Sequence, residues 1–235
     1  ELNKIWAEVD RVLIEGGFAC INIGDATRKI NNLFQLYPNH VKISEYFQGL
    51  GYSTLPCIIW RKQSNKPNKF MGSGMLPPNA YVTLEHEYIL IFRKGSKREF
   101  SLLDLEQRRK SAYFWEERNL WFSDVWMDLK GASQRLNHGK LRKTSAAFPF
   151  ELAYRLINMY SIQGDYILDP FLGTGTTTLA AMCSGRNSVG YELCSNFEEI
   201  IQDRLSNIKE FQIGLTEERI SCHRKFVGER FATRT

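Results

Sequence analysis

The chain has 235 residues, of which 43% are hydrophobic and 24% are charged, values that exclude disordered and fibrous proteins. The length is sufficient for one large domain with a substantial core. The net charge is only +5, but residues 61–110 carry 11 basic and 5 acidic side chains, so this part of the chain suits either a polyanion or an ordinary solvated surface.

The first third of the chain alternates between helix and strand patterns. Apolar residues recur at helical spacing over 2–14, and Gly16-Gly17 then ends the helix. Short apolar runs predict buried strands at 18–23 and 53–60, with a second helix at about 39–48 between them. This order predicts an α/β sheet that is covered on both faces.

The middle of the chain is less regular. Residues 61–80 are rich in Lys, Asn, Gly and Pro, which predicts a long basic loop, and a strand pattern resumes at 88–92. Between 100 and 147 aromatic side chains are mixed with charged ones. They suit stacking on bases, but they also suit the core of a small helical insertion, which we expect for most of them.

The last third is regular again. Helices are predicted at 150–160, 177–183 and 197–211, and strands at 166–168 and 188–191. The residues from 214 onward are expected to be a polar tail without a motif.

The five cysteines are widely spaced without a Cys-x-x-Cys pair, and the four histidines are scattered. We therefore expect free, mostly buried thiols in a reducing cytoplasm, and no metal site. No apolar run approaches the ~18 residues of a membrane span, and the first residues do not resemble a secretory signal. A soluble protein without a membrane partner is expected.

The stretch YILDPFLGTGTTT, residues 166–178, carries the clearest chemistry. A strand ends in Asp169, turns through Gly173 and Gly175, and opens a helix, which places a ligand at the carboxyl end of a parallel strand. The glycines allow close approach of the backbone, and the helix N-terminus offers N–H groups to a carboxylate. Glu192 ends the next strand and is placed to bind both hydroxyls of a ribose.

Two common nucleotide sites do not fit this stretch. Thr178 replaces the third glycine of a dinucleotide motif, and the Gly-Lys-Ser/Thr of a P-loop is absent. A nucleoside with a small charged tail remains, which indicates S-adenosylmethionine.

The run LDPFLGTGTT resembles the methionine-binding motif of the DNA amino-methyltransferases, which methylate N4 of cytosine or N6 of adenine. The similarity covers most of the chain. Residues 145–152 resemble the element before that motif, 16–25 the strand after the catalytic loop, and 58–60 with 85–90 the distal strand pair. The target-base half precedes the cofactor half, as in the circularly permuted β group.

The resemblance implies the class I S-adenosylmethionine-dependent methyltransferase fold in permuted order, a doubly wound, mostly parallel α/β sheet with a small basic insertion. The implied segments are a target-base half at 1–98 with the basic loop 61–80, a recognition insertion at 99–147, a cofactor-binding half at 148–213 and a polar tail at 214–235.

The resemblance also implies two sets of site residues. The residues expected to bind S-adenosylmethionine are Phe148, Pro149, Asp169, Pro170, Phe171, Gly173, Gly175, Thr176, Thr177 and Glu192. Core packing is the alternative role for Phe148 and Phe171. The residues expected to contact double-stranded DNA are Arg61, Lys62, Lys66, Lys69, Arg135, Lys140, Arg142 and Lys143.

The family's catalytic tetrapeptide, Ser/Asp/Asn-Pro-Pro-aromatic, localises the lone pair of the target amine and stacks on the flipped base. It is absent here, so the catalytic residues are unknown, and we expect that an N-terminal piece is missing from this sequence. Leu76-Pro77-Pro78-Asn79 has only the prolines. Pro56-Cys57 resembles the nucleophile of carbon-5 cytosine methyltransferases, but it precedes the cofactor motif within an apolar strand, so we interpret Cys57 as structural.

The leading hypothesis is a site-specific DNA methyltransferase of a restriction–modification system, with cytosine N4 slightly favoured over adenine N6. The alternatives are methylation of RNA or of a protein amide by the same fold, and a cofactor- or DNA-binding subunit whose catalytic half is elsewhere. A homodimer and a cognate restriction endonuclease, the latter as a functional and not a physical partner, are also considered.

Overall fold

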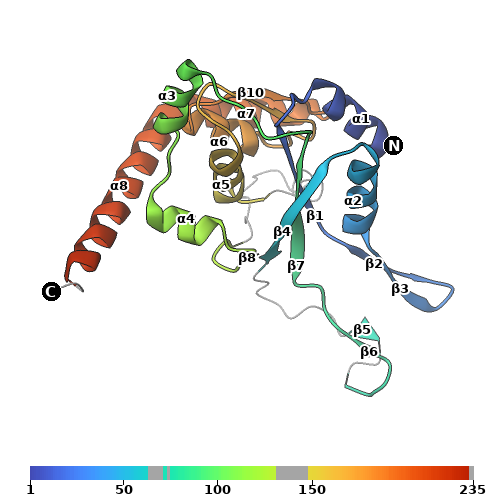
Figure 1. The fold of residues 1–235 in the computed structure, drawn as a ribbon. Helices are drawn as coiled ribbons and strands as arrows, with labels where there is room; N and C mark the ends of the chain where they lie inside the picture. The colour runs from blue at the N-terminus through green and yellow to red at the C-terminus, as the bar shows by residue number, and fades with distance from the viewer. Residues whose placement is uncertain (63–70, 73–74, 131–147, 233–235) are drawn as a thin grey trace. The chain divides into compact units, whose positions relative to one another are not determined.

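The computed structural model describes residues 1–62, 71–72, 75–130 and 148–232, and it confirms the predicted α/β class. The chain divides into two compact units, and Figure 1 labels their helices and strands. One comprises Glu1–Glu99 with Ser123–Gly131, and the other comprises Phe100–Phe122 with Ala132–Thr235. These units differ from the segments expected from the sequence, because the stretch 99–147 contributes residues to both.

The first unit is built on a sheet with the strand order β1-β7-β4-β8. These strands are β1 (Phe18–Ile23), β7 (His86–Arg93), β4 (Ser53–Arg61) and β8 (Val125–Trp126). β7 runs antiparallel to β1 and β4, whereas β4 and β8 are parallel. The described residues between β4 and β7 form no crossover helix, so the chain returns beside β4 in the opposite direction. This sheet is therefore mixed, where a mostly parallel one was expected.

Two helices form the core of the first unit together with the sheet. They are α1 (Leu2–Val12) and α2 (Asn39–Gly49), close to their predicted positions. Trp6 of α1 and Phe47 of α2 belong to one apolar cluster with Phe92 of β7, and the Phe47 and Phe92 rings stack at 4.6 Å. Burying an aromatic side chain of this size stabilises the fold by about 1.5–3 kcal/mol.

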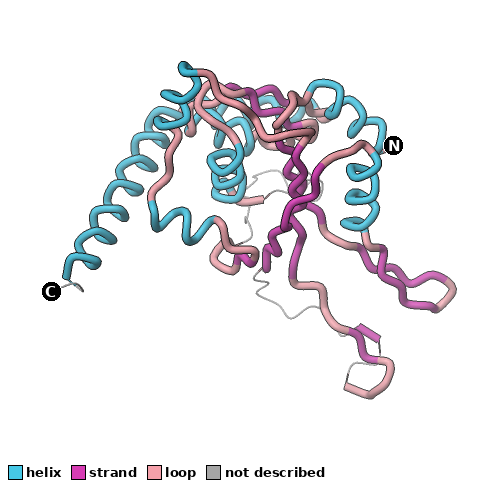
Figure 2. Tube along the Cα trace, in the orientation of Figure 1, coloured by secondary structure: helices cyan, strands magenta, loops and turns pink. Residues whose placement is uncertain are grey.

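The sequence patterns do not predict the two hairpins of the first unit. β2 (Ala26–Ile30) pairs with β3 (Leu33–Tyr37), and β5 (Met71–Gly72) pairs with β6 (Ala80–Tyr81) within the expected basic loop. β2–β3 runs out from the sheet as a two-stranded ribbon (Figure 2). Its strands are largely exposed, so they lack the apolar alternation by which a half-buried strand is predicted.

The second unit contains a parallel strand pair, the first strand of which belongs to the predicted motif. β9 (Tyr166–Asp169) pairs in parallel with β10 (Asn187–Gly190), and α6 (Thr176–Cys183) connects them. α5 (Phe150–Tyr160) precedes β9 and packs on α6, where the small, fully buried Ala180 and Ala181 allow close approach. All four elements agree with the sequence prediction to within one or two residues.

Residues 195–232 form a longer helical region than the sequence predicts. The elements are η2 (Ser195–Phe197), α7 (Glu198–Ser206) and α8 (Ile208–Ala232), so the expected polar tail belongs to a helix. Polar contacts hold α8 against α4 (Trp115–Trp121): Arg219 donates to Glu117 at 2.6 and 2.8 Å, and the His223 ring stacks on Phe114 at 3.9 Å. Because α8 is held by polar contacts, its sequence shows little of the apolar periodicity from which a helix is predicted.

The aromatic residues of 100–122 and 125–126 divide between core and surface. Trp121, at the end of α4, and Trp126, in β8, are 3% and 1% exposed, as expected for core residues. Trp115 and Phe122 are 56% and 43% exposed. Before them, α3 (Leu102–Lys110) begins with a reciprocal Ser101–Asp104 capping box.

The cysteines are free thiols, but the expectation that most are buried holds only for Cys183, since Cys222 is exposed and the other three are partly exposed. Burial raises the pKa of the Cys183 thiol to about 11, so it stays protonated at neutral pH. Over the described residues, every helix is too short or too polar to cross a lipid bilayer.

Candidate functional site

The turn between β9 and α6 is the predicted ligand loop, and its glycines adopt conformations that other residues avoid. Gly173 has a φ of +55° and Gly175, directly before α6, has a φ of +77°. A Cβ atom on Gly175 would also lie 3.1 Å from Ile201 Cγ1 of α7. Glycine at 175 therefore satisfies both a left-handed backbone and a close approach of α7.

Asp169 holds the loop at its start. One carboxylate oxygen, Oδ1, accepts a hydrogen bond from the Phe171 N–H at 2.9 Å, and the other, Oδ2, accepts one from Thr177 Oγ1 at 2.5 Å. The carboxylate thus joins the end of β9 to the first turn of α6. This arrangement explains why an acid at the end of the strand is needed for the shape of the loop.

Glu192 closes the other side of the same loop. Its Oε2 accepts a hydrogen bond from the Gly173 N–H, and its Oε1 accepts one from the Cys194 N–H, both at 2.8 Å. Each carboxylate oxygen has further lone pairs, so these bonds leave acceptor capacity for a ligand. Asp169 and Glu192 are 23 positions apart in the sequence, and the parallel pairing of Asp169 with Gly190 places both acids at one loop.

Arg204 also contacts the loop between β9 and α6, and the sequence did not predict this role. It lies on α7, and its Nη1 donates to the Thr174 carbonyl at 2.9 Å, to Thr174 Oγ1 at 3.1 Å and to Thr176 Oγ1 at 3.3 Å. Burial lowers the pKa of this guanidinium from its usual value. A lone arginine in a charged helix carries no motif, so only the folded contacts reveal its role.

The other predicted cofactor residues lie in two settings. Pro170 and Phe171 are in the loop, with Phe171 49% exposed, and Thr176 begins α6 with only 8% of its surface exposed. Phe148 packs against the core cluster that contains Trp121 and Ala153, and Pro149 immediately precedes α5. The contact of Phe148 with the core supports the packing alternative, and its role toward a cofactor stays a prediction.

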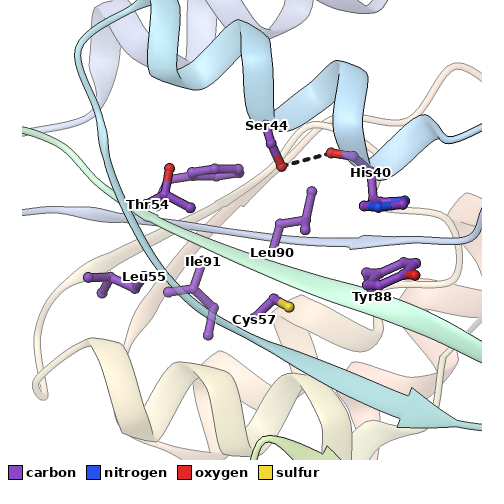
Figure 3. Close-up of a pocket in the computed structure, with 9 residues that line it drawn as sticks. His40, Ser44, Thr54, Leu55, Cys57, Tyr88, Leu90 and Ile91 are labelled. Carbon is purple, nitrogen blue, oxygen red and sulfur yellow. Dashed lines mark hydrogen bonds between the residues drawn. The ribbon is translucent and has the colours of Figure 1, made fainter.

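A second candidate site is a cavity of about 260 Å³ in the first unit (Figure 3). His40, Cys57 and Tyr88 line it among apolar residues, and Cys57 also packs against the apolar core, in keeping with a structural role. His40 Nδ1 lies 2.8 Å from both carboxylate oxygens of Asp25, and its ring stacks on Tyr88 at 4.0 Å. Burial and the nearby Asp25 carboxylate raise the pKa of Tyr88.

Two of the eight residues predicted to contact DNA fall within the described part of the chain. Arg61 forms an ion pair with Glu85 at 3.0 Å, and Lys62 forms one with Glu87. The charges of Arg61 and Lys62 are thus partly balanced by the neighbouring acids Glu85 and Glu87. The predictions for Lys66, Lys69, Arg135, Lys140, Arg142 and Lys143 lie outside the described residues.

Comparison with known proteins identifies the family. The family model for N6 and N4 methyltransferases, described as DNA methylase, matches residues 1–203, which include the sheet of the first unit and the loop after β9. The chain belongs to this DNA methylase family. This match confirms the family suggested by LDPFLGTGTT, and it extends well beyond that motif.

Individual relatives of this chain agree with the family match. The Type II methyltransferase M.MthZI of Methanothermobacter thermautotrophicus is 64% identical, over 98% of this chain and 65% of its own length. M.MjaI of Methanocaldococcus jannaschii, also a Type II methyltransferase, is 56% identical over 91% of this chain and 69% of its own length. The chain thus spans about two thirds of these relatives.

A solved structure has the same architecture. The Thermus thermophilus protein TTHA0409, assigned as a DNA modification methylase, is known in complex with S-adenosyl-L-methionine. It superposes with a TM-score of 0.72 and 34% identity, over 88% of this chain and 76% of its own.

Proposed function

We propose that this DNA methylase moves a methyl group from S-adenosylmethionine to an exocyclic base amine of double-stranded DNA. The observation that carries the proposal is the loop between β9 and α6, which Asp169, Glu192 and Arg204 hold at the carboxyl end of a parallel strand. The names of M.MthZI and M.MjaI as Type II methyltransferases support a role in restriction–modification.

The residues of the loop suit S-adenosylmethionine chemically. Among the residues that the structure describes, a Cβ atom on Gly173 would meet only the Phe171 carbonyl, at 3.9 Å, so there is space for a ligand at this backbone position. The N–H groups of the first turn of α6 would bind the methionine carboxylate, and Glu192 would bind the ribose hydroxyls. The bound cofactor would supply a methyl group on a positively charged sulfur. The complex of TTHA0409 with the same molecule supports this assignment.

The target base is proposed on general similarity alone, with cytosine N4 favoured over adenine N6. The tetrapeptide that would hold the amine does not occur in this sequence, and we assign no catalytic residue. We further propose a cytoplasmic location, a homodimer, and a restriction endonuclease that recognises the same DNA sequence without binding the methylase.

Methyl transfer tests the proposal directly. The purified chain, alone and joined to a segment that carries the Ser/Asp/Asn-Pro-Pro-aromatic tetrapeptide, is incubated with tritiated S-adenosylmethionine and either plasmid DNA or total RNA, and digested nucleosides are separated by chromatography. Label in N4-methylcytosine or N6-methyladenine of DNA is the expected result when the tetrapeptide is present. Label in RNA alone contradicts the proposal. Cofactor binding without transfer favours a cofactor-binding subunit whose catalytic half is elsewhere.

Replacing Arg204 with alanine is expected to weaken S-adenosylmethionine binding by about 10-fold. The loop would lose the hydrogen bonds at Thr174 and Thr176, and it would have to become ordered when the ligand binds. Calorimetry measures the affinity, and hydrogen exchange of the loop amides measures the loss of order. Arg224→Ala, at an exposed position on α8, is the matched control. Equal affinity for Arg204→Ala and the control would contradict this role.

A further inference from the structure

The β2–β3 hairpin is an antiparallel ribbon that has no part in the proposed cofactor site. Its two-residue turn consists of Asn31 and Asn32, with φ of 49° and 61°, which is the backbone of the tight turn that favours a twisted hairpin. The strands pair from Ala26↔Tyr37 to Ile30↔Leu33. Figure 1 shows the ribbon projecting away from the β1-β7-β4-β8 sheet.

Contacts at its base fix the hairpin to α2. Asn39 Nδ2 donates to the Gly24 carbonyl at 3.0 Å, and the His40 N–H donates to Asp25 Oδ1 at 3.2 Å. The same Asp25 carboxylate contacts His40 Nδ1. Both strands of the ribbon are therefore anchored at its base.

The two faces of the ribbon differ. Side chains alternate along a strand, so Phe34 shares one face with its cross-strand neighbour Lys29, and the Phe34 ring stacks on Tyr81 of β6 at 4.5 Å. The opposite face carries Arg28 directly across from Gln35. Both of these side chains are exposed.

Two aliphatic side chains continue the exposed face to the tip. Ile30 and Leu33 pair across the strands next to the turn and are 51% and 73% exposed. Arg28 donates one hydrogen bond, from Nη1 to the Thr27 carbonyl at 2.9 Å, which uses one of the five N–H groups of its guanidinium. Residues 26–37 contain two basic side chains and no acidic one.

We propose that this face of the β2–β3 hairpin enters the major groove of duplex DNA, where Arg28 and Gln35 contact base edges and Ile30 and Leu33 contact apolar groups such as thymine methyls. The major groove accommodates a two-stranded ribbon. Arginine makes paired hydrogen bonds to guanine, and glutamine does so to adenine. The proposal rests on the proposed function for its choice of DNA.

A second copy of this chain is the alternative occupant of the face. Two aliphatic side chains beside a guanidinium and an amide offer much less than the ~800 Å² per partner that a stable protein interface buries. The positive charge would also face its own copy. The charge and hydrogen-bonding groups of this face therefore favour a polyanion that presents hydrogen-bond donors and acceptors, as base edges of DNA do.

Selection of bound duplexes tests the proposal without requiring catalysis. The full chain and its variants are each incubated with a library of 30-base-pair duplexes of random sequence, and bound molecules are sequenced. Arg28→Ala is expected to reduce the preference for a guanine, and Gln35→Ala the preference for an adenine, each by about 10-fold at one position of the bound motif.

Lys29→Ala is the matched control. Lys29 is next to Arg28 in the sequence but lies on the opposite face of the ribbon, so this variant also removes one positive charge. It is expected to leave the bound motif unchanged, whatever its effect on overall affinity. An unchanged motif in both Arg28→Ala and Gln35→Ala, or a wild-type chain that selects no motif, would overturn the proposal. Circular dichroism checks that each variant is folded.

Two further measurements separate this proposal from its alternatives. If the wild-type chain selects a motif but neither binds S-adenosylmethionine in calorimetry nor transfers methyl groups, the proposed function fails while the hairpin proposal stands. Sedimentation of the Leu33→Lys variant measures its oligomeric state and so tests whether a second copy of the chain binds this face. Conversion of a dimer to a monomer with an unaltered DNA motif would assign the face to self-association and overturn its role in DNA binding.

Discussion

Replacing Asp169 with alanine is expected to weaken S-adenosylmethionine binding by about 100-fold or more. The carboxylate accepts hydrogen bonds from the Phe171 N–H and from Thr177 Oγ1, and it thereby sets the path of the backbone through Gly173 and Gly175. A hydrogen bond to a charged group contributes about 1.5–3 kcal/mol, so the loss of two is sufficient for an effect of this size. Isothermal calorimetry measures the affinity directly.

Asp169→Asn separates the shape of the loop from its charge. The asparagine oxygen can still accept from the Phe171 N–H, and the Thr177 hydroxyl can rotate to accept from the side-chain amide. This variant is expected to retain more affinity than Asp169→Ala. Glu199→Ala removes an exposed carboxyl from α7 and serves as the control. Wild-type affinity in Asp169→Ala, with the fold intact by circular dichroism, would remove the assignment of the cofactor site to this loop.

Replacing Arg186 with alanine is expected to destabilise the second unit by about 3 kcal/mol. This arginine is only 5% exposed, and burial lowers the pKa of its guanidinium. It donates to Asn158 Oδ1 and to the carbonyls of Ser161 and Ser184, which joins the ends of α5 and α6 to the start of β10. Without the guanidinium these acceptors, of which the Ser161 carbonyl is partly buried and the other two are buried, would lose this partner, at a cost of about 1–3 kcal/mol for each buried group left unsatisfied.

Urea denaturation measures this loss, and hydrogen exchange of the α5 and α6 amides locates it in the second unit. Lys225→Ala is the matched control, because the Lys225–Glu229 pair on α8 is 4.0 Å apart and highly exposed. Exposed pairs of this kind contribute at most about 1 kcal/mol. A denaturation midpoint for Arg186→Ala equal to that of the control would show that the network does not stabilise the unit.

The site illustrates which residues sequence reasoning can find. Asp169 and Glu192 follow directly from the strand–turn–helix pattern, because the ends of two parallel strands must meet at one edge. Arg204 has no such pattern, since it reaches Thr174 through the tertiary position of α7. For Phe148 the sequence left two roles open, cofactor binding and core packing, and only the structure shows its contact with the Trp121 cluster.

The sequence alone determined the α/β class, the positions of most helices and strands, the strand–turn–helix loop at 166–178 and the family of this chain. Each depends on local information: apolar spacing, strand-ending acids and glycines with left-handed backbones. The tertiary structure decided the antiparallel direction of β7, the length of α8 and the exposed face of the β2–β3 hairpin. These features depend on contacts between residues far apart in the chain, such as Arg219 with Glu117 and Phe34 with Tyr81, which leave no periodic trace in the sequence.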